Sequence, residues 1–352
     1  MMIGLIMAGG SGKRFWPLSR QKFPKQFLKI TSDLSMIEMS FNRLLGKIKR
    51  EDIYIVTAES QVELVKQNIP GISVENIIIE PQGMNTAPAI ALSMKYLSDR
   101  YDKNEVVFIG GSDYEILNTK GFIDSLEPAE KSALQGNLVT FGVKPAYPST
   151  GYGYVEGGEK TQFGLKVKNF KEKPDEETAK EFLKAGNYYW NSGMFMWTLE
   201  SISDAYNKYL PKVSQLTDEI GMLWGKNGYR VNISELYARM PKMPVDIGIM
   251  EQAENRIVIP VDYGWSDVGG WKALYDISKK DSNNNVMQCK SMSFDSFGNY
   301  INSNKYIAMI GVNNLVVVDT EDVLLIANID KSENVKDVVS ALEKDKLSNH
   351  LI

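Results

Sequence analysis

The sequence has only one histidine and one cysteine among its 352 residues. His350 is close to the end of the sequence, so we expect it in a terminal segment and not in a catalytic centre. Cys289 has no second cysteine to pair with, which excludes an internal disulfide and a cysteine-rich metal site. An enzyme of this composition must use carboxylates, lysines, arginines and backbone dipoles, a set that suits phosphoryl transfer.

Long hydrophobic runs and a strong charge imbalance are also lacking. No apolar run approaches the roughly 20 residues that span a bilayer, and the start, 1–4, lacks the basic region of a signal peptide. The 40 basic and 44 acidic residues give a net charge of -4, which argues against a general nucleic-acid or membrane-surface partner. We therefore expect a cytoplasmic protein with no nucleic-acid partner and no membrane partner.

Enough apolar sequence is present, 43% of the residues, for a sizeable core in one large and one smaller domain. The first half alternates apolar runs of strand length with helical segments. We expect strands at 3–7, 53–57, 76–80, 105–110 and 137–143, and helices at 60–68 and 86–101. This alternation predicts an α/β fold with a Rossmann-like, mostly parallel sheet flanked by helices, whose ligands bind beyond the carboxyl ends of the strands.

The second half is more mixed and ends in a β-rich region. Between 151 and 254 we expect strands at 151–156, 167–172 and 188–197, and helices at 176–185, 200–209, 212–224, 232–239 and 246–254. The polar run 281–285 is typical of a linker. The sequence thus predicts one domain over 1–280 and a small β-rich domain over 286–352 that ends in a helix.

The most informative segment follows the first expected strand. Glycine stands at positions 9, 10 and 12, and lysine or arginine at positions 13, 14, 20 and 25. A glycine backbone can approach a ligand closely, its N–H groups attract anions, and Arg14 can hold two phosphate oxygens. We therefore predict a polyphosphate site here, the alternative being an ordinary basic turn. Walker and dinucleotide loops fit poorly, because Arg14 and Phe15 stand where a hydroxyl residue and a third glycine belong.

The same segment, continued by Pro24-Lys25-Gln26, resembles the signature of the sugar-1-phosphate nucleotidyltransferases. Trp16 and the Pro-Lys-Gln version resemble the mannose-1-phosphate guanylyltransferase branch. The resemblance implies transfer of GMP from GTP to mannose 1-phosphate, giving GDP-mannose and pyrophosphate. It implies catalytic roles for Arg14 and Lys25, which would balance charge on the triphosphate. The residues it implies for nucleotide binding in this segment are Ala8, Gly9, Gly10, Ser11, Gly12 and Lys13.

Two aspartates are candidates for a metal site. Asp113 ends an expected strand, and Asp267 lies in the glycine- and tryptophan-rich run 264–271. Taken alone, each is more simply explained as a turn or helix-cap residue. The resemblance implies instead that both bind Mg²⁺, a cation that takes oxygen ligands and bridges phosphates. The run Gly-Ser-Asp-Tyr at 111–114 departs from the family's usual Pro-Ala/Ser-Asp-His, although the aspartate is kept.

Further residues are implied for the two substrates. The run 80–89 resembles the base-recognition segment, with Glu80, Asn85 and Thr86 as candidates, although it also has the composition of a helix start. The resemblance implies a sugar-phosphate site formed by Gly153, Glu172, Lys173 and Asn191. Without it, Gly153 would be a strand bulge and Glu172-Lys173 a solvated charge run.

Two alternatives to this function remain open. The chain could act on another sugar 1-phosphate or another nucleoside triphosphate, or it could be a catalytically silent regulatory homologue. The resemblance also implies that the C-terminal domain is β-helix-like and can join two chains in a homodimer.

Overall fold

A computed structural model describes residues 1–10, 12–344 and 348–351. The chain forms two compact units, each made of several chain segments. Unit 1 consists of Met1–Gly9, Ser40–Ser112 and Ile116–Trp265, and unit 2 of Gly10–Met39, Asp113–Glu115 and Ser266–Ile352. Unit 2 therefore contains the predicted phosphate loop together with the C-terminal strands, whereas the sequence had assigned residues 10–39 to the large domain.

Unit 1 is built on a nine-stranded sheet with the order β3-β2-β1-β4-β9-β6-β10-β8-β7. Neighbouring strands are parallel from β3 to β4 and between β6 and β10. Strand β9 is antiparallel to both β4 and β6, and the β7–β8 hairpin is antiparallel too. The strands are β1 (Met2–Ala8), β2 (Ile53–Ala58), β3 (Ile77–Glu80), β4 (Val106–Gly111), β6 (Leu138–Val143), β7 (Tyr154–Lys160), β8 (Leu165–Lys171), β9 (Tyr188–Thr198) and β10 (Arg256–Val261).

The predicted α/β class is confirmed, with the parallel pairs concentrated in the first half of the chain. Parallel neighbours need long crossovers, and helices supply them between β1 and β4. Strands β7 and β8 are antiparallel because the turn 161–164 between them is too short for a parallel crossover. Strand β10 was not predicted.

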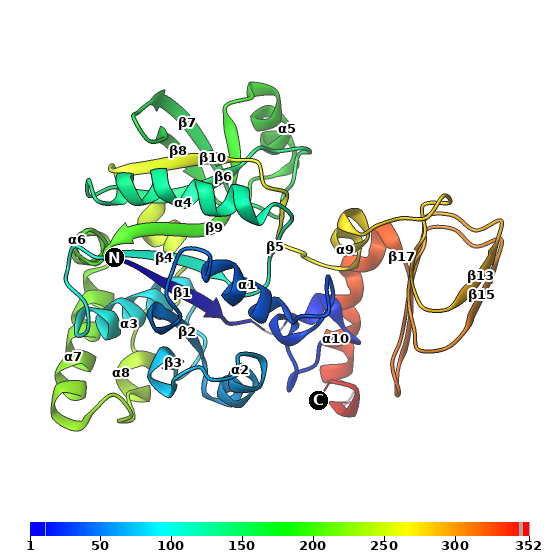
Figure 1. The fold of residues 1–352 in the computed structure, drawn as a ribbon, viewed down its shortest axis with the longest axis horizontal. Helices are drawn as coiled ribbons and strands as arrows, with labels where there is room; N and C mark the ends of the chain where they lie inside the picture. Colours follow the sequence, from blue (N-terminus) through cyan, green and yellow to red (C-terminus); the bar gives the residue numbers. More distant parts are fainter. Residues whose placement is uncertain (11, 345–347, 352) are drawn as a thin grey trace. The chain divides into compact units, whose positions relative to one another are not determined.

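Helices cover the sheet of unit 1 (Figure 1). Helix α4 packs on β6, β9 and β10, while α3, α6 and α7 pack on one another. The helices are α2 (Val62–Asn68), α3 (Thr86–Ser98), α4 (Thr119–Ala133), α5 (Glu176–Ala185), α6 (Leu199–Tyr209), α7 (Pro211–Asn227) and α8 (Ser234–Ala238). The sequence did not predict α4, which contains the helix-disfavouring residues Gly121 and Pro128. The helix expected at 246–254 is a shorter π-helical turn, Asp246–Met250.

Unit 2 joins the first loop of the chain to a C-terminal β-structure. Strands β12, β14 and β16 follow one another in parallel, and so do β13 and β15, which confirms the predicted β-rich domain. Its core includes Phe15, Trp271 and Tyr300, whose rings pack edge-on or tilted. The elements are α9 (Trp271–Ile277), β12 (Val286–Gln288), β13 (Ser291–Phe294), β14 (Tyr300–Asn302), β15 (Ile307–Ile310), β16 (Leu315–Asp319), β17 (Leu324–Asn328) and α10 (Val335–Lys344).

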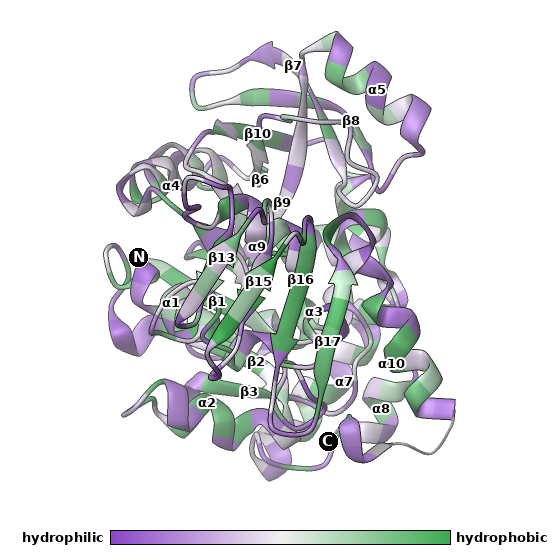
Figure 2. Ribbon diagram, turned by 90° about the vertical axis from the view of Figure 1, so that its right-hand side faces the viewer, coloured by the Kyte–Doolittle hydropathy of each residue, from purple (hydrophilic) through white to green (hydrophobic). Residues whose placement is uncertain are grey.

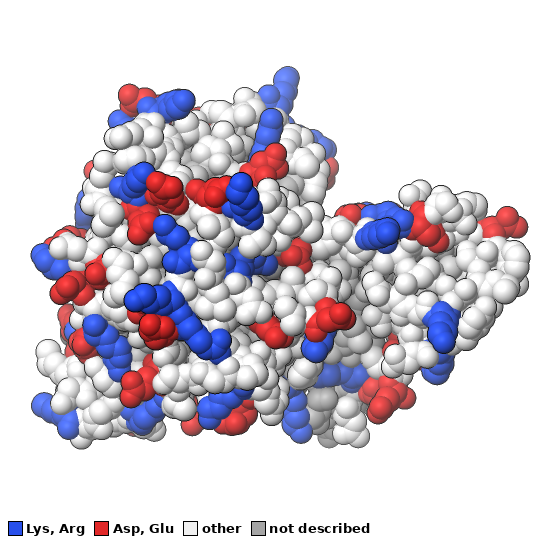
Figure 3. Space-filling view, viewed as in Figure 1, with Lys and Arg blue, Asp and Glu red and all other residues white. Residues whose placement is uncertain are grey.

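The boundary between the two units falls within three elements: α1 (Met36–Leu44), β5 (Glu115–Ile116) and β11 (Trp265–Ser266). Within the described ranges, no helix has both the length and the apolarity to cross a membrane. On the face of the molecule shown in Figure 3, acidic and basic side chains are interspersed, as the small net charge leads one to expect.

Candidate active site

Lys25 links three chain segments of unit 2. It begins the short 3₁₀ turn Lys25–Phe27 and is only 6% exposed. Its Nζ atom donates to the main-chain oxygen of Asp113 at 2.6 Å, to Oδ2 of Asp113 at 3.0 Å and to the main-chain oxygen of Asp267 at 2.7 Å. Because an ammonium group has three donors, all of them have partners within the protein. The predicted catalytic lysine is thus bonded to the main chain of both predicted metal ligands and to the carboxylate of Asp113.

Gly12 packs directly against Lys25. Its φ of 57° is in the left-handed region, and a Cβ atom there would lie 2.4 Å from the Cβ of Lys25, so only glycine fits. On the carbonyl side, Ser19 Oγ donates to the Gly12 oxygen at 2.7 Å. The ring of Phe15 lies 5.7 Å from Lys25 Nζ, within the range of a cation–π contact. The glycine loop and Lys25 therefore fix each other's position.

The segment that carries Asp267 has a strained backbone. Val268 is buried and has a φ of 43°, an outlier for a β-branched residue. Its N–H donates to Ser266 Oγ at 3.1 Å, which helps to hold this conformation. A Cβ atom on Gly269 would lie 2.7 Å from Oδ2 of Asp267, so glycine leaves room for the carboxylate. Strain of this kind clusters at functional sites, where surrounding contacts maintain it.

The start of the predicted phosphate loop is open. Ala8 is buried at the end of β1, and its oxygen accepts from Thr57 Oγ1 at 2.8 Å. Gly9 and Gly10 are exposed, and a Cβ atom on either would meet no atom within 4 Å. This leaves space for a ligand to approach the backbone. Ser11, also predicted to bind nucleotide, lies outside the described residues.

The cations of the loop have different surroundings. Arg14 is exposed, beside the start of α9, where a Cβ atom on Gly270 would lie 3.8 Å from the Cβ of Arg14. Lys13 Nζ donates to Glu343 of α10 at 2.6 Å. The charge of Arg20 had suggested a phosphate contact, but its guanidinium group is bound by Asp322 and by the main-chain oxygen of His350. These contacts reduce the positive charge that the segment offers to an anion, and leave Arg14 as its accessible arginine.

The two aspartates suit a cation that arrives with a phosphate ligand. The side chain of Asp113 is 46% exposed, and Asp267 is half-buried. Among the described residues, no group of three or more His, Cys, Asp or Glu side chains could hold a metal ion by itself. Mg²⁺ commonly binds one or two carboxylates and takes its other ligands from water and substrate phosphates. The donor set therefore fits a hard divalent cation bound together with a nucleotide.

In the run 111–114, which departs from the family pattern, the aspartate is accessible. Tyr114 is 6% exposed, so the aromatic ring fills a buried position, whereas the preceding Asp113 remains half-exposed. Tyr114 is thus packed inside the protein, and the carboxylate of Asp113 stays in contact with Lys25.

The predicted base-recognition residues lie in unit 1, between β3 and α3. Glu80 Oε1 accepts from Tyr237 OH at 2.8 Å, and burial raises the pKa of the Glu80 carboxyl. Asn85 Oδ1 accepts from the N–H of Thr86 at 2.8 Å, so Asn85 caps the start of α3. Thr86 Oγ1 in turn accepts from the N–H of Val245 at 2.8 Å. Each of the three accepts a structural hydrogen bond, Asn85 as the cap of α3, and their binding of a base stays a prediction.

The four residues predicted for the sugar phosphate come together in unit 1. A Cβ atom on Gly153 would lie 2.5 Å from Oε2 of Glu172, and the N–H of Asn191 donates to the Gly153 oxygen at 2.8 Å. Lys173 has a φ of 45° and forms an ion pair with Glu172. The glycine therefore makes room for the carboxylate, and the ammonium group lies beside it.

Asp246 belongs to the same cluster and was missed from the sequence. Asn191 Nδ2 donates to Asp246 Oδ1 at 2.7 Å, while Asn191 Oδ1 accepts from Thr140 Oγ1 at 2.9 Å. Burial, and then the charge of Glu172, raise the pKa of Asp246 to about 6. Asp246 begins the π-helical turn, a conformation often found at functional sites. Its only signal in the sequence was a carboxylate within the otherwise apolar run 244–250.

Comparisons with known proteins agree over nearly the full length of the chain. The nucleotidyl transferase family model matches residues 3–284, and the MannoseP isomerase/GMP-like beta-helix domain matches 290–342. Mannose-1-phosphate guanylyltransferases of Salmonella muenchen and Klebsiella pneumoniae are 38% and 36% identical over 99% of this chain, and over 75% and 76% of their own lengths. A crystal structure from Thermus thermophilus, titled a mannose-1-phosphate geranyltransferase, has a TM-score of 0.88 at 28% identity and covers 97% of this chain and 99% of its own.

Proposed function

The chain belongs to the nucleotidyl transferase family, and from this premise we propose how its residues act. The reaction is that of its mannose-1-phosphate guanylyltransferase relatives: transfer of GMP from GTP to mannose 1-phosphate, giving GDP-mannose and pyrophosphate. The observation that supports the proposed roles best is the buried ammonium group of Lys25, bonded to the segments of both Asp113 and Asp267.

The reaction needs positioning and charge stabilisation more than proton transfer. A phosphate oxygen of mannose 1-phosphate attacks the α-phosphorus of GTP. As that P–O bond forms, the bond from the α-phosphorus to the oxygen bridging to the β-phosphate breaks, and pyrophosphate leaves with the electron pair. The attacking oxygen is already ionised at neutral pH, so no protein base is required, which is compatible with the near absence of histidine.

We assign the triphosphate to the glycine loop. The open backbone at Gly9 and Gly10 gives N–H groups access to phosphate oxygens, and the exposed Arg14 can bind them in a bidentate manner. Lys25 contributes a fixed positive charge and holds the two aspartates in place. Gly12 and Lys13 continue the loop, and Glu80, Asn85 and Thr86 would contact the guanine.

Nucleotidyltransferases of this family generally use a divalent metal ion, and we propose that here it is Mg²⁺. Asp113 and Asp267 would hold it. When bound, it neutralises negative charge on the reacting phosphates.

We assign mannose 1-phosphate to the cluster around Gly153. Glu172 and Asn191 can exchange hydrogen bonds with sugar hydroxyls, and the ammonium group of Lys173 can bind the phosphate. Asp246 acts as a positioning residue, because its carboxylate fixes the orientation of the Asn191 amide.

The activity of the purified protein tests this function. Pyrophosphate release should be fastest with GTP and mannose 1-phosphate in a panel of GTP, ATP, UTP and dTTP against mannose 1-phosphate and glucose 1-phosphate. A faster reaction with another pair would establish the alternative substrate. If a folded, metal-loaded protein releases no pyrophosphate with any of these substrate pairs, the result would support a silent regulatory homologue.

The raised pKa of Asp246 leads to a prediction on pH. Below about pH 6 the carboxyl is protonated and loses its charge-assisted bond to Asn191, so the KM for mannose 1-phosphate should rise as the pH falls through 6. Asp246→Asn should remove this part of the profile. Titration of the substrate's own phosphate affects both proteins equally, so the difference between their profiles isolates Asp246. Identical profiles would contradict the assignment.

We further propose that residues 1–280 and 286–352 are the catalytic and the C-terminal domain, and that the latter joins two chains. The C-terminal β-rich region exposes large apolar side chains: Met292, Phe294, Tyr306, Ile310, Leu324 and Ile326, all more than half exposed. Figure 2 shows β15, β16 and β17 largely in hydrophobic colours. Exposed apolar patches of this kind are typical of protein interfaces. Light scattering should give twice the chain mass of 39.6 kDa, and a monomer would contradict the proposal.

The nearly cysteine-free composition and the nucleotide substrate support a cytoplasmic location, which we also propose.

A further inference from the structure

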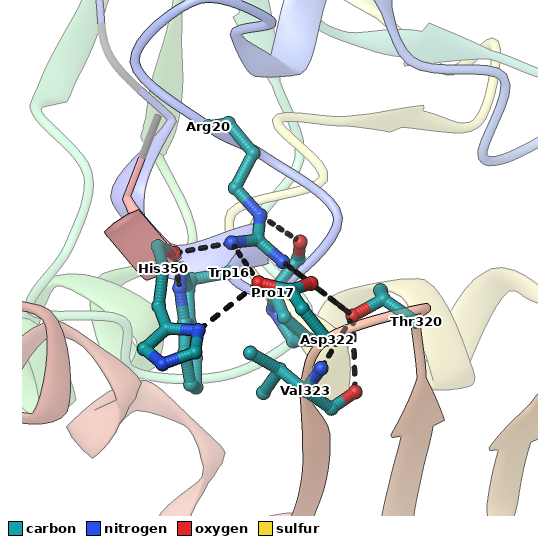
Figure 4. A network of polar contacts seen from close by, with 7 residues as sticks. All are labelled: Trp16, Pro17, Arg20, Thr320, Asp322, Val323 and His350. Carbon is teal, nitrogen blue, oxygen red and sulfur yellow. Dashed lines mark hydrogen bonds and ion pairs between the residues drawn. The ribbon is translucent and has the colours of Figure 1, made fainter. Parts of the chain in front are cut away.

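The turn that follows the glycine loop is held by residues from the far end of the chain (Figure 4). Trp16 Nε1 donates to the main-chain oxygen of His350 at 2.8 Å, and the N–H of Gln21 donates to that of Leu351 at 2.7 Å. Arg20 stands between Trp16 and Gln21 in the sequence. Residues 348–351 lie beyond both family-model matches, 3–284 and 290–342, so neither model describes these contacts.

Arg20 is the most strongly bound residue of this turn. Its Nη2 donates to Oδ1 of Asp322 at 2.7 Å and its Nη1 to Oδ2 at 3.1 Å, a bidentate pair. Nη1 also donates to the main-chain oxygen of His350, and Nε donates to that of Pro17 at 2.7 Å. The Arg20 side chain is 13% exposed. The two Nη atoms of Arg20 thus bind C-terminal residues, while its Nε atom binds the main chain of its own turn at Pro17.

Asp322 is suited to hold this arginine at every working pH. The Arg20 guanidinium, and then the hydrogen bond with His350, keep the pKa of the Asp322 carboxyl far below its usual range. Thr320 Oγ1 also donates to Asp322 Oδ1, at 3.1 Å, and fixes the turn between β16 and β17. The carboxylate therefore stays ionised and oriented.

A short path connects Arg20 to the site residues. Ser19, its neighbour, donates to the Gly12 oxygen at 2.7 Å, and the N–H of Ser19 donates to the Phe15 oxygen at 3.0 Å. Gly12 in turn packs on Lys25. A displacement of Arg20 would move Ser19 and so release the carbonyl of Gly12.

We propose that Arg20, Asp322 and the main chain of 350–351 form a brace that positions the nucleotide loop. This goes beyond a role of the C-terminal domain in joining chains: the domain also completes the nucleotide site. The expected effect of the brace on GTP binding rests on the proposed function of the loop. Its expected effect on hydrogen exchange in the loop does not. Arg20 and Asp322 are positioning residues and touch no substrate.

Asp322→Asn tests the brace. It should raise the KM for GTP about tenfold, the value of one charge-assisted hydrogen bond, with kcat within about threefold of wild type. Hydrogen exchange at residues 12–21 should become faster. A merely structural role would lower the melting temperature or the active fraction without changing KM. Asp322→Glu should restore part of the lost affinity.

Asp319→Asn is the matched control. Asp319 lies on the preceding strand β16 and forms its own ion pair with Lys305 at 2.8 Å, within the C-terminal strands. Its loss should leave both the KM and the exchange of 12–21 unchanged. If Asp322→Asn has the wild-type KM for GTP and the wild-type hydrogen exchange at 12–21, the proposal of a brace is wrong. If wild-type protein does not turn over GTP, the proposed function fails, and the exchange rates still decide whether the brace exists.

Discussion

Replacing Lys25 by methionine is expected to lower kcat/KM for GMP transfer by roughly 10²–10³-fold, as loss of a preorganised charge in an active site does. The substitution keeps the length of the side chain and removes the three donors that bind Asp113 and Asp267. Two main-chain oxygens and a carboxylate would then lose their partner, at a cost to folding of about 1–3 kcal/mol. Steady-state kinetics and a thermal unfolding curve of the same preparation measure both effects.

Lys29→Met is the matched control for Lys25→Met. Lys29 lies four residues further on and is exposed, so activity should stay within about twofold of wild type. Should the methionine variant fail to fold, Lys25→Arg keeps the charge but cannot reproduce three bonds in this geometry, and should still lose more than about tenfold. Near wild-type activity in both Lys25 variants would contradict the role given to this residue.

Asp267→Asn is expected to have the second largest effect. The amide keeps the shape of the side chain but removes a charged oxygen ligand, so kcat should fall by about two orders of magnitude or more, and the Mg²⁺ concentration for half-maximal rate should rise. Chelation of divalent ions should stop the wild-type reaction, and added Mg²⁺ should restore it.

Asp276→Asn provides the comparison for Asp267→Asn. Asp276 is an exposed acid on the neighbouring helix α9, so its loss should leave the metal dependence unchanged. An unaltered Mg²⁺ dependence in Asp267→Asn would show that this carboxylate is not a metal ligand.

The sequence predicted the loop chemistry well because its signals are local. Three glycines and several cations within 25 residues point to an anion site by composition alone, and the structure gives Gly12 a left-handed backbone against Lys25. The alternation of strands and helices likewise predicts the parallel half of the sheet, since each crossover helix lies between its two strands.

Residues that act through distant partners could not be predicted. Asp322 meets Arg20 across about 300 positions of sequence, and neither residue differs in type from many other surface charges. Asp246 became recognisable only through its bond to Asn191 and its burial. Arg20 illustrates the reverse error: its position suggested a phosphate contact, but Asp322 competes for the same guanidinium fork and binds it.

The most direct measurement is a crystal structure of the protein with Mg²⁺ and GDP-mannose. We expect the diphosphate against the backbone of 9–13, with the metal ion bound by the carboxylates of Asp113 and Asp267 and with Lys25 beside them. Phosphates bound away from this loop, or a metal ion that neither aspartate contacts, would contradict it.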